Sequence, residues 1–172
     1  VRFKLWDGVK GQENGGQSYA VPTGDLRRAA HRIADFIYEK LTGEKGVFST
    51  RIAYVTKAGG RFTLWVADSD GEGAQAAASS AEPIISPAWS PNGGQLAYVS
   101  FGQRKPIVSV ITLQTGANRV VANFKGNNSS PAWSPDGRSI AFVRSRGQTR
   151  PVKPCGPGPD RRLVCIGDQQ SE

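Results

Sequence analysis

The sequence predicts a mainly β protein: a partial β-propeller of two to three blades, preceded by a small α/β part in the order strand, strand, helix. Two observations carry this prediction. A segment built on Ser-Pro-Ala-Trp-Ser-Pro recurs 44 positions further along the chain, and repeats of about 40–50 residues are typical of propeller blades. Glycine and proline are abundant, with 21 and 11 of the 172 residues, which favours a turn-rich β architecture.

Residues 1–45 differ from the rest and form the α/β part. Val1–Trp6 has the alternation of a strand, a glycine-rich loop follows, and Gln17–Val21 is predicted to be a second strand. Strand, strand and helix cannot close a core within this length. We therefore expect the C-terminal half of an α/β domain that begins outside the sequence, and the chain also contains no methionine.

An amphipathic helix is expected between Pro22 and Gly43. Thr23 or Asp25 can cap its start, and Gly43 can take the left-handed conformation that follows a helix end. Apolar residues recur at steps of three and four, as one buried face requires. This face comprises Leu26, Ala30, Ile33, Ile37 and Leu41.

Residues 46–143 form the propeller part, joined to the helix through Glu44–Thr50. Val47 and Phe48 lie in this connection, so we expect it to be packed. The repeat aligns Ser86–Val99 with Ser130–Val143, and each copy carries a Ser-Pro-Asn/Asp-Gly segment that suits a type I turn. We expect the two tryptophans to be packing residues. The repeat anchors are Trp89, Pro91, Gly93, Trp133, Pro135 and Gly137.

Each repeat has the segments of a four-stranded blade. A short strand precedes the turn, and a strand rich in β-branched and aromatic residues follows it. Phe62–Gly71 and Ile107–Gly116 match each other as third strands closed by a glycine turn. Asn118–Phe124 is predicted to be a fourth, outer strand, whereas Ala74–Ser80 is a poor counterpart in the preceding unit.

The pattern stops after Val143. Residues 144–172 are rich in arginine and proline, contain both cysteines of the chain and show no alternation, so no third blade is expected from them. We expect this tail to be disordered, translated in a wrong frame or fused from an unrelated sequence. Two blades and the opening of a third leave strand edges exposed, which predicts poor stability for the chain on its own.

No catalytic residue, metal site or cofactor is expected. Gly16–Ala20 resembles a nucleophile elbow but ends in alanine and precedes its strand instead of following one. The single histidine, His31, is expected to be exposed on the helix. Asp68, Asp70 and Asp136 lie at turns, where aspartate bonds to its own backbone, and a calcium site would need more oxygen ligands.

The net charge of +8 raises the question of nucleic acid binding. The charge is scattered over the sequence and does not interleave with aromatic residues, as single-strand binders require. We therefore expect a solvated basic surface and no nucleic acid partner.

Three segments together carry a family resemblance: Arg27–Val55, Gly15–Pro22 and the Ser-Pro-Ala-Trp-Ser-Pro-Asp-Gly unit at Ser130–Gly137. The first joins the helix to the first repeat and is the most specific of the three. With these segments the chain closely resembles the TolB family, the periplasmic components of the Tol-Pal envelope system. The likeness covers Val1 to about Val143.

The resemblance implies an α/β domain followed by a six-bladed propeller that acts as a non-enzymatic periplasmic scaffold. In this family the propeller binds the peptidoglycan-associated lipoprotein Pal, and an N-terminal region missing here contacts the inner-membrane Tol proteins. The system maintains outer-membrane integrity during cell division, and colicins and filamentous phages exploit it. These partners and this localisation are expectations for the chain.

An alternative is the propeller domain of a prolyl-oligopeptidase-like serine peptidase, because peptidase propellers share the repeat. The helical segment before the first repeat argues against it. For the scaffold, the residues expected to bind a partner lie in the loops entering the innermost strands, where plain solvated connections remain an equal interpretation. They are Glu82, Pro83, Asn127 and Asn128.

Overall fold

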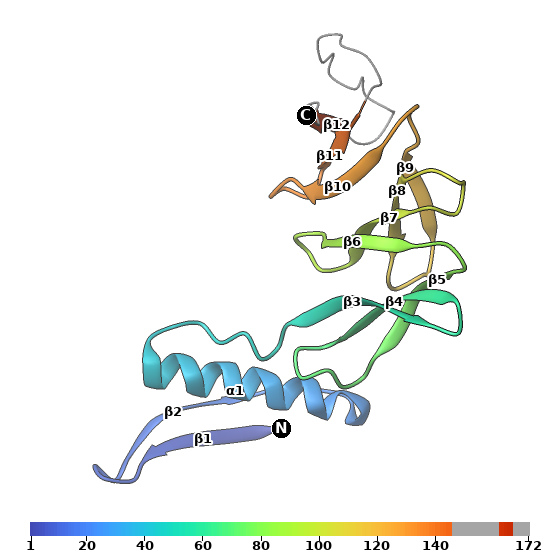
Figure 1. Cartoon of the computed structure of the whole chain (residues 1–172). Coiled ribbons are helices and arrows are strands. Elements are labelled where there is room, and N and C mark those ends of the chain that lie inside the picture. The colour runs from blue at the N-terminus through green and yellow to red at the C-terminus, as the bar shows by residue number, and fades with distance from the viewer. Residues whose placement is uncertain (146–161, 167–172) are drawn as a thin grey trace. The chain divides into compact units, whose positions relative to one another are not determined.

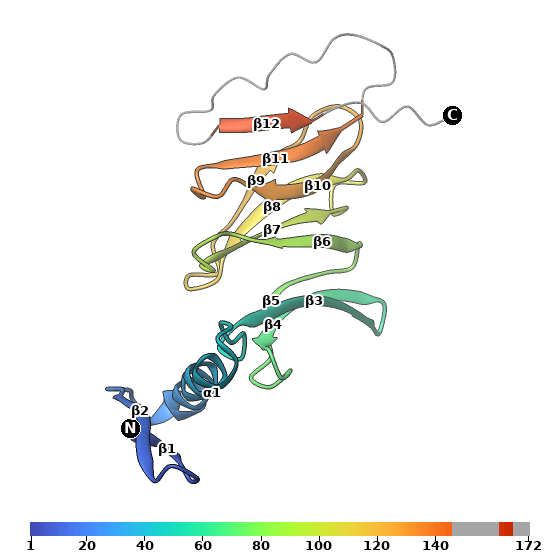
Figure 2. The ribbon, with the colours of Figure 1, turned by 90° about the vertical axis from the view of Figure 1, so that its left-hand side faces the viewer.

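The computed structural model describes residues 1–145 and 162–166 (Figures 1 and 2). The chain divides into two compact units. The first comprises Val1–Ile52 and Ala67–Gly73, and the second comprises the remainder. The first unit contains a hairpin and a helix, whereas the second consists of β-sheets.

The hairpin of the first unit pairs β1 (Arg2–Asp7) with β2 (Gln12–Ser18) in antiparallel fashion. The first strand is as predicted, but the second was predicted at Gln17–Val21 and this position was wrong. The chain turns directly after β1, where the Gly11 N–H donates to the Asp7 carbonyl at 2.9 Å. Gly11 adopts a φ of +61°, which glycine tolerates without strain, so β2 begins inside the expected loop.

The predicted helix is present. A short 3-10 turn, η1 (Thr23–Asp25), leads into α1 (Leu26–Thr42). Asp25 stands at the N-cap position, but its side chain makes no capping hydrogen bond. Gly43 ends the helix as predicted, with a φ of +79° and its N–H donated to the Glu39 carbonyl at 2.9 Å.

The apolar face of α1 differs from the predicted one. Ala29 is its one fully buried residue, and Phe36 packs edge-on against Phe3 of β1 with ring centroids 5.2 Å apart. Leu26 and Leu41, at the two ends of the predicted face, are 49% and 68% exposed. A two-stranded sheet is too narrow to cover the whole helix, so only its middle is packed.

The connection from α1 to the first sheet is packed against the helix, as expected, although only one of its two apolar residues does this. Phe48 is 40% exposed and packs edge-on against Tyr38 of α1 with ring centroids 5.8 Å apart, whereas Val47 is 66% exposed. The Asp35 carboxylate also accepts hydrogen bonds from the backbone N–H groups of Phe48 at 2.7 Å and Ser49 at 3.1 Å. The Ser49 hydroxyl donates to the same carboxylate. Contacts with the helix therefore fix the path of the connection.

The central blade of the second unit confirms the predicted four-stranded repeat. Its strands are all antiparallel to their neighbours and follow one another in sheet order β6-β7-β8-β9. Their bounds are Ile84–Trp89 for β6, Gln95–Ser100 for β7, Ile107–Thr112 for β8 and Asn118–Ala122 for β9.

The sheet before the central blade has three strands, in the order β3-β4-β5. They are β3 (Arg51–Ala58), β4 (Arg61–Asp68) and β5 (Gln75–Ser80). The segment Ala74–Ser80 was considered a poor counterpart of the outer strand, and that interpretation was wrong, because β5 pairs with β4 at the outer end of the sheet. Its small residues suit an outer edge strand, where pairing depends on the backbone and little side-chain packing is required.

The third sheet has the order β10-β11-β12. Its antiparallel pair β10 (Asn128–Trp133) and β11 (Ser139–Arg144) repeats β6 and β7 at the 44-residue offset. β12 (Arg162–Ile166) pairs with β11 in parallel, whereas the third strand of a blade is antiparallel.

The tail was not expected to contain a strand, so β12 is a difference from the prediction. A parallel neighbour requires a long crossover, and the stretch between β11 and β12 is long enough to supply one. Cys165 lies in β12. The remaining tail residues, Cys155 among them, lie outside the described residues. The predictions that the tail is disordered or translated in a wrong frame apply to those residues.

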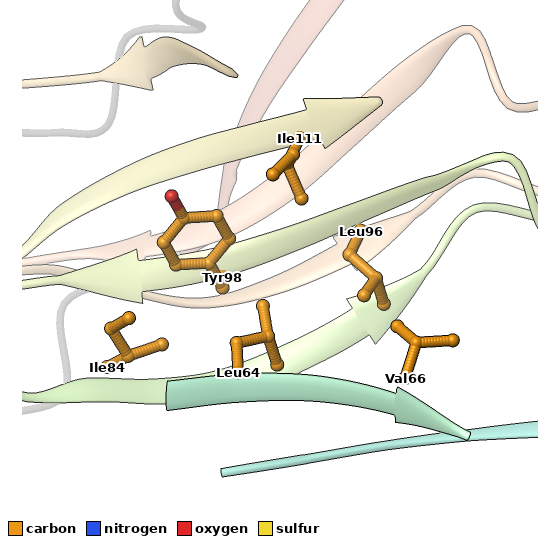
Figure 3. Close-up of a cluster of buried hydrophobic side chains, with 6 residues drawn as sticks. All are labelled: Leu64, Val66, Ile84, Leu96, Tyr98 and Ile111. Atoms are coloured by element: carbon orange, nitrogen blue, oxygen red, sulfur yellow. The ribbon is translucent and has the colours of Figure 1, made fainter. Parts of the chain in front are cut away.

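The sheets of the second unit pack face to face through three apolar clusters. The first joins the β3–β5 sheet to the central blade (Figure 3). The other two join the central blade to β11. Each fully buried Val, Leu, Ile or Phe side chain contributes about 1.5–3 kcal/mol to stability. The clusters are Leu64, Val66, Ile84, Leu96, Tyr98 and Ile111; Ala97, Val110 and Ile140; and Val108, Ala122 and Phe142.

The repeat tryptophans lie at these sheet contacts. Trp89 packs against the first cluster and Trp133 against the second. The Trp133 Nε1–H also donates to the Ala88 carbonyl of the preceding inner strand at 3.1 Å. The recurring tryptophan therefore connects one blade to the next, which explains why it repeats with the blade.

The repeated turns have the same hydrogen bonds in both copies. Gly93 donates its N–H to the Ser90 carbonyl at 2.8 Å and has a φ of +65°, and Gly137 repeats this arrangement with Ser134 at 2.9 Å and a φ of +67°. The Ser90 hydroxyl accepts the Gln95 N–H at 2.9 Å. The prolines at the second turn positions, Pro91 and Pro135, are exposed.

Candidate functional site

The loops that enter the two inner strands are equivalent in structure as well as in sequence. The Pro83 carbonyl accepts the N–H of Phe101 at 3.1 Å, and the Asn127 carbonyl accepts the N–H of Ser145 at 3.2 Å. Each bond closes the end of the ladder between an inner strand and its neighbour. The backbone of both loops is therefore fixed by the sheet that follows.

Three of the four predicted partner-binding residues are accessible. Glu82 is exposed, and its backbone N–H donates to the Ser80 hydroxyl at 3.0 Å. This hydrogen bond fixes the backbone of the turn that carries the Glu82 carboxylate. Pro83 is half-buried. Asn127 is exposed, and its Nδ2 donates to the Ser129 hydroxyl at 3.4 Å.

Asn128, the fourth, does not present its side chain to a partner. It is 0% exposed, and its Nδ2 donates to the carbonyls of Pro106 and Phe124 at 3.0 Å and of Gly126 at 3.3 Å. Its Oδ1 accepts the Phe124 N–H at 3.2 Å. Its amide is consumed in holding the loop that precedes β10, so Asn128 would contribute to the predicted binding only by fixing the position of this loop.

Both inner strands contain a bulge that the sequence analysis missed. Ser86 and Ser130 have positive φ values of +53° and +51°. The register of each strand with its neighbour shifts at this point. A proline follows each serine, and proline inside a strand is confined to edges and bulges. The Ser-Pro pair within each predicted strand could therefore have indicated the bulge.

These features combine into one exposed surface, which we call the inner-strand surface. β6 and β10 lie side by side (Figure 1), and the serine at the bulge of each strand is exposed. The surface combines a carboxylate, an amide, two hydroxyls and one apolar side chain, Ile85, which is 43% exposed. Such a mixture suits docking of another protein. Its exposed members are Glu82, Ile85, Ser86, Asn127 and Ser130.

Asp136 serves its own turn, as predicted. Its Oδ1 accepts the hydroxyl of Ser134 at 2.5 Å and the N–H of Arg138 at 2.9 Å. These hydrogen bonds, that of Ser134 first, hold the pKa of the Asp136 carboxyl below its usual range. The role of this aspartate is structural.

A second group of polar residues joins α1 to the end of β4, within the first unit. Arg27 of α1 donates Nε to the Asp68 carboxylate at 3.3 Å, and its second terminal nitrogen binds the Asp70 carboxylate. The hydrogen bond from Arg27 is the main cause that lowers the pKa of Asp70. We call this group the α1 clamp. Local sequence could not predict it because its members are about forty positions apart.

His31 belongs to the α1 clamp, and its expected exposure was wrong. Its side chain is 17% exposed, and Nε2 lies 3.4 Å from the Asp70 carboxylate. His31, Asp68 and Asp70 offer ligand atoms within 4.8 Å of one another. The Arg27 guanidinium is ion-paired with both carboxylates, so a metal ion would have to compete with this cation for them. Nε2 of His31 is buried and has no hydrogen-bond partner.

Along residues 1–145 and 162–166, no helix combines the length and the apolar character that a membrane crossing requires.

Comparison with known proteins identifies close relatives. A family profile described as the TolB beta propeller domain matches residues 38–152. The Tol-Pal system protein TolB of Albidiferax ferrireducens is 68% identical over 130 residues, which are 76% of this chain and 31% of the relative. The protein of the same name from a Polaromonas species is also 68% identical over 130 residues, 76% of this chain and 30% of the relative. The chain thus spans about a third of the length of these relatives.

Two solved structures of proteins named TolB also match the chain. The crystal structure of TolB from Acinetobacter baumannii matches with a TM-score of 0.78 and 42% identity, over 84% of this chain and 37% of that one. A putative TolB from Agrobacterium tumefaciens matches with a TM-score of 0.52 and 25% identity, over 60% of this chain and 38% of that one.

Proposed function

The chain belongs to the TolB beta-propeller family, and we propose that it forms part of a non-enzymatic periplasmic scaffold of the Tol-Pal envelope system. The observation that carries this proposal is the 68% identity over 130 residues to proteins named Tol-Pal system protein TolB. In this role the chain helps to maintain outer-membrane integrity during cell division.

The proposed partner is the lipoprotein Pal, and the proposed contact is the inner-strand surface. Its exposed residues lie on neighbouring strands and on the loops that enter them, whose backbone is fixed by the sheets, so little ordering entropy is lost on binding. Ile85 supplies an exposed apolar side chain within a polar rim, the composition expected of a docking site. Inner-membrane Tol proteins would be bound by other parts of the longer protein, and colicins would be further partners.

The absence of catalysis is part of the proposal. A serine peptidase requires a serine nucleophile within hydrogen-bond reach of a histidine base. Among the described residues the only histidine, His31, faces Asp70 and is enclosed in the α1 clamp. A role in docking requires none of this chemistry.

A chimera tests the proposal in a complete protein. The 130 matching residues of the Albidiferax ferrireducens TolB would be exchanged for those of this chain, and affinity for Pal of that organism would be measured by calorimetry. We expect a Kd within about threefold of the parent, equivalent to about 0.6 kcal/mol. Loss of binding by a chimera that folds would contradict the proposal.

Two variants of the chimera test the surface. Ile85→Arg places a charge in the middle of the inner-strand surface, and we expect it to weaken Pal binding about tenfold or more. Val120→Arg is the matched control, because Val120 is 49% exposed on the outer strand β9. Equal effects of the two substitutions would exclude the inner-strand surface as the contact.

A further inference from the structure

The chain contains the tripeptide Asn-Gly-Gly twice, in two different structural settings. Asn14–Gly16 lies in β2 of the first unit, and Asn92–Gly94 lies in the turn between β6 and β7 of the central blade. An asparagine followed by glycine is especially prone to deamidation, because glycine has no side chain that hinders the approach of its backbone nitrogen to the asparagine amide. Since the reacting residues are identical, a difference in reactivity between the two sites must come from the structure.

Deamidation of asparagine proceeds through a cyclic succinimide. The backbone nitrogen of the following glycine bonds to the side-chain carbonyl carbon, Cγ, and the Cγ–Nδ2 bond breaks. The proton of the glycine nitrogen goes to the leaving amide nitrogen, which departs as ammonia. Water then opens the ring at one of its two carbonyl groups and yields aspartate or isoaspartate. Water is the only co-reactant, and nothing is oxidised or reduced.

The side chain of Asn92 is held in a position that favours this reaction. Its Oδ1 accepts hydrogen bonds from the Ser90 hydroxyl at 2.8 Å and from the Gly94 N–H at 3.0 Å. Two donors on the carbonyl oxygen polarise Cγ and stabilise the negative charge that this oxygen gains as the new bond forms. The bond to Gly94 also folds the side chain back over the Gly93 peptide, which carries the nucleophile. Asn92 is exposed, so ammonia can leave and water can enter.

One hydrogen bond of the turn opposes the reaction. The Gly93 N–H donates to the Ser90 carbonyl at 2.8 Å, and this bond must open before the Gly93 nitrogen can attack. Exposed turns open locally at a much smaller free-energy cost than global unfolding. The fold therefore slows the attack on Asn92 but does not prevent it.

Asn14 has a less reactive setting, although it is also exposed. It lies in β2 between Glu13 and Gly15, which both pair with residues of β1. Gly15 carries the nucleophilic nitrogen and packs under Phe36 of α1, whose Cζ lies 3.0 Å from the position that a β-carbon would take. Within the part of the chain that the structure describes, no group donates a hydrogen bond to the Asn14 side chain, so solvent alone polarises its carbonyl. Ring closure at Asn14 would have to open the hairpin.

The second repeat shows that the aspartate product fits the turn. Asp136 occupies the position of Asn92, 44 residues later in the chain. Its Oδ1 accepts hydrogen bonds from the Ser134 hydroxyl and the Arg138 N–H, the same two bonds that Asn92 accepts in the first turn. An aspartate at this position therefore keeps the hydrogen bonds of the turn.

We propose that Asn92 is a site of spontaneous deamidation, which converts the first turn of the repeat into the aspartate form already present in the second. The conversion adds one negative charge at this turn. The isoaspartate product inserts one carbon atom into the main chain, so it displaces Gly93 from its hydrogen bond with the Ser90 carbonyl. This inference concerns the chemistry of the chain itself and does not depend on Pal binding.

Peptide mapping of the full 172-residue chain by mass spectrometry tests the proposal. The folded chain would be incubated in neutral buffer, and the acid form at each Asn-Gly pair would be measured over time, with fragmentation to separate aspartate from isoaspartate. We expect Asn92 to convert at least about tenfold faster than Asn14, because only Asn92 has two donors on its carbonyl oxygen. In urea the turn and the hairpin are both lost, so the two rates should become similar.

Three variants test the site and its product. Asn92→Gln should abolish conversion at this position, because the larger ring that glutamine would form closes much more slowly. Asn14→Gln is the matched control and should leave the rate at Asn92 unchanged. Asn92→Asp makes the aspartate product directly, and its urea midpoint should equal that of the parent because Asp136 supports the same turn.

Three outcomes would overturn the inference. The first is conversion of Asn14 at the same rate as Asn92, or faster, in the folded chain. The second is an unreactive Asn92 in the folded chain while the unfolded chain reacts, which would mean that the turn protects it. The third is a clearly lower urea midpoint for Asn92→Asp, which would mean that the first turn does not accept the product. Because Pal is absent from these experiments, their result is independent of the proposed scaffold function.

Discussion

The central blade and the helix α1 are stabilised by different forces. In β7 and β8 most residues are buried, and their side chains form apolar clusters with both neighbouring sheets. In α1 only Ala29 is fully buried, and the contacts to the end of β4 are ion pairs at the surface. Burial of an apolar side chain contributes more to the free energy of unfolding than a surface ion pair does. The same type of substitution should therefore have unequal effects on stability in the two regions.

Leucine truncation should show the largest difference. Leu96 of β7 is 0% exposed, whereas Leu41 of α1 is 68% exposed. We expect Leu96→Ala to lower the free energy of unfolding by about 2–5 kcal/mol, because it removes buried atoms and leaves a cavity. Leu41→Ala should change it by less than about 0.5 kcal/mol. Urea denaturation followed by circular dichroism measures both, and similar losses would refute the comparison.

The two adjacent asparagines before β10 offer a sharper test within the blades. Asn128→Ala leaves the carbonyls of Pro106, Phe124 and Gly126 without their buried donor, and we expect a loss of about 1–3 kcal/mol. Asn127→Ala, one position earlier, alters an exposed side chain and should be nearly neutral. The measurement is the denaturant midpoint of each variant. A neutral Asn128→Ala would mean that water replaces the lost donor.

A smaller effect of opposite sign is expected at the bulge of β6. Ser86 has a φ of +53°, a conformation that costs an L-residue about 1–2 kcal/mol and glycine little. Ser86→Gly should therefore stabilise the chain, by about 0.5 kcal/mol after the entropy cost of glycine is included. Ser79→Gly on β5 lacks this relief and should be destabilising. The two melting temperatures should move in opposite directions, and a shared direction would show that Ser86 is unstrained.

The repeat could be predicted from sequence because its signals are local. The turn needs only Ser90, Pro91 and Gly93 in succession, and the tryptophan stands directly before them. The helix end at Gly43 is local in the same way. Each of these features depends on a few consecutive residues, so periodicity and turn chemistry were sufficient to place them.

The site was less predictable because burial is decided by distant residues. Asn128 occupies the repeat position at which the preceding blade has Ile84, and both are buried. A polar residue in a predicted loop gives no indication of the carbonyls that will surround it. The α1 clamp was missed for the same reason, since Arg27 and Asp70 are 43 positions apart in sequence.

The smallest expected effect concerns the α1 clamp, and it depends on pH. The pKa of Asp70 is lowered, chiefly by the hydrogen bond from Arg27. A carboxyl with a lowered pKa stabilises the folded state above its unfolded pKa of about 3.9, and this contribution is lost as the pH falls through the folded value. We therefore expect Arg27→Gln to shift the urea midpoint slightly at pH 6 and not at pH 2. Arg61→Gln is the charge-matched control, because the Nε of Arg61 donates to the Ser79 hydroxyl and not to a carboxylate. An equal shift at both pH values would mean that Arg27 acts through packing of its aliphatic stem and that its charge contributes nothing.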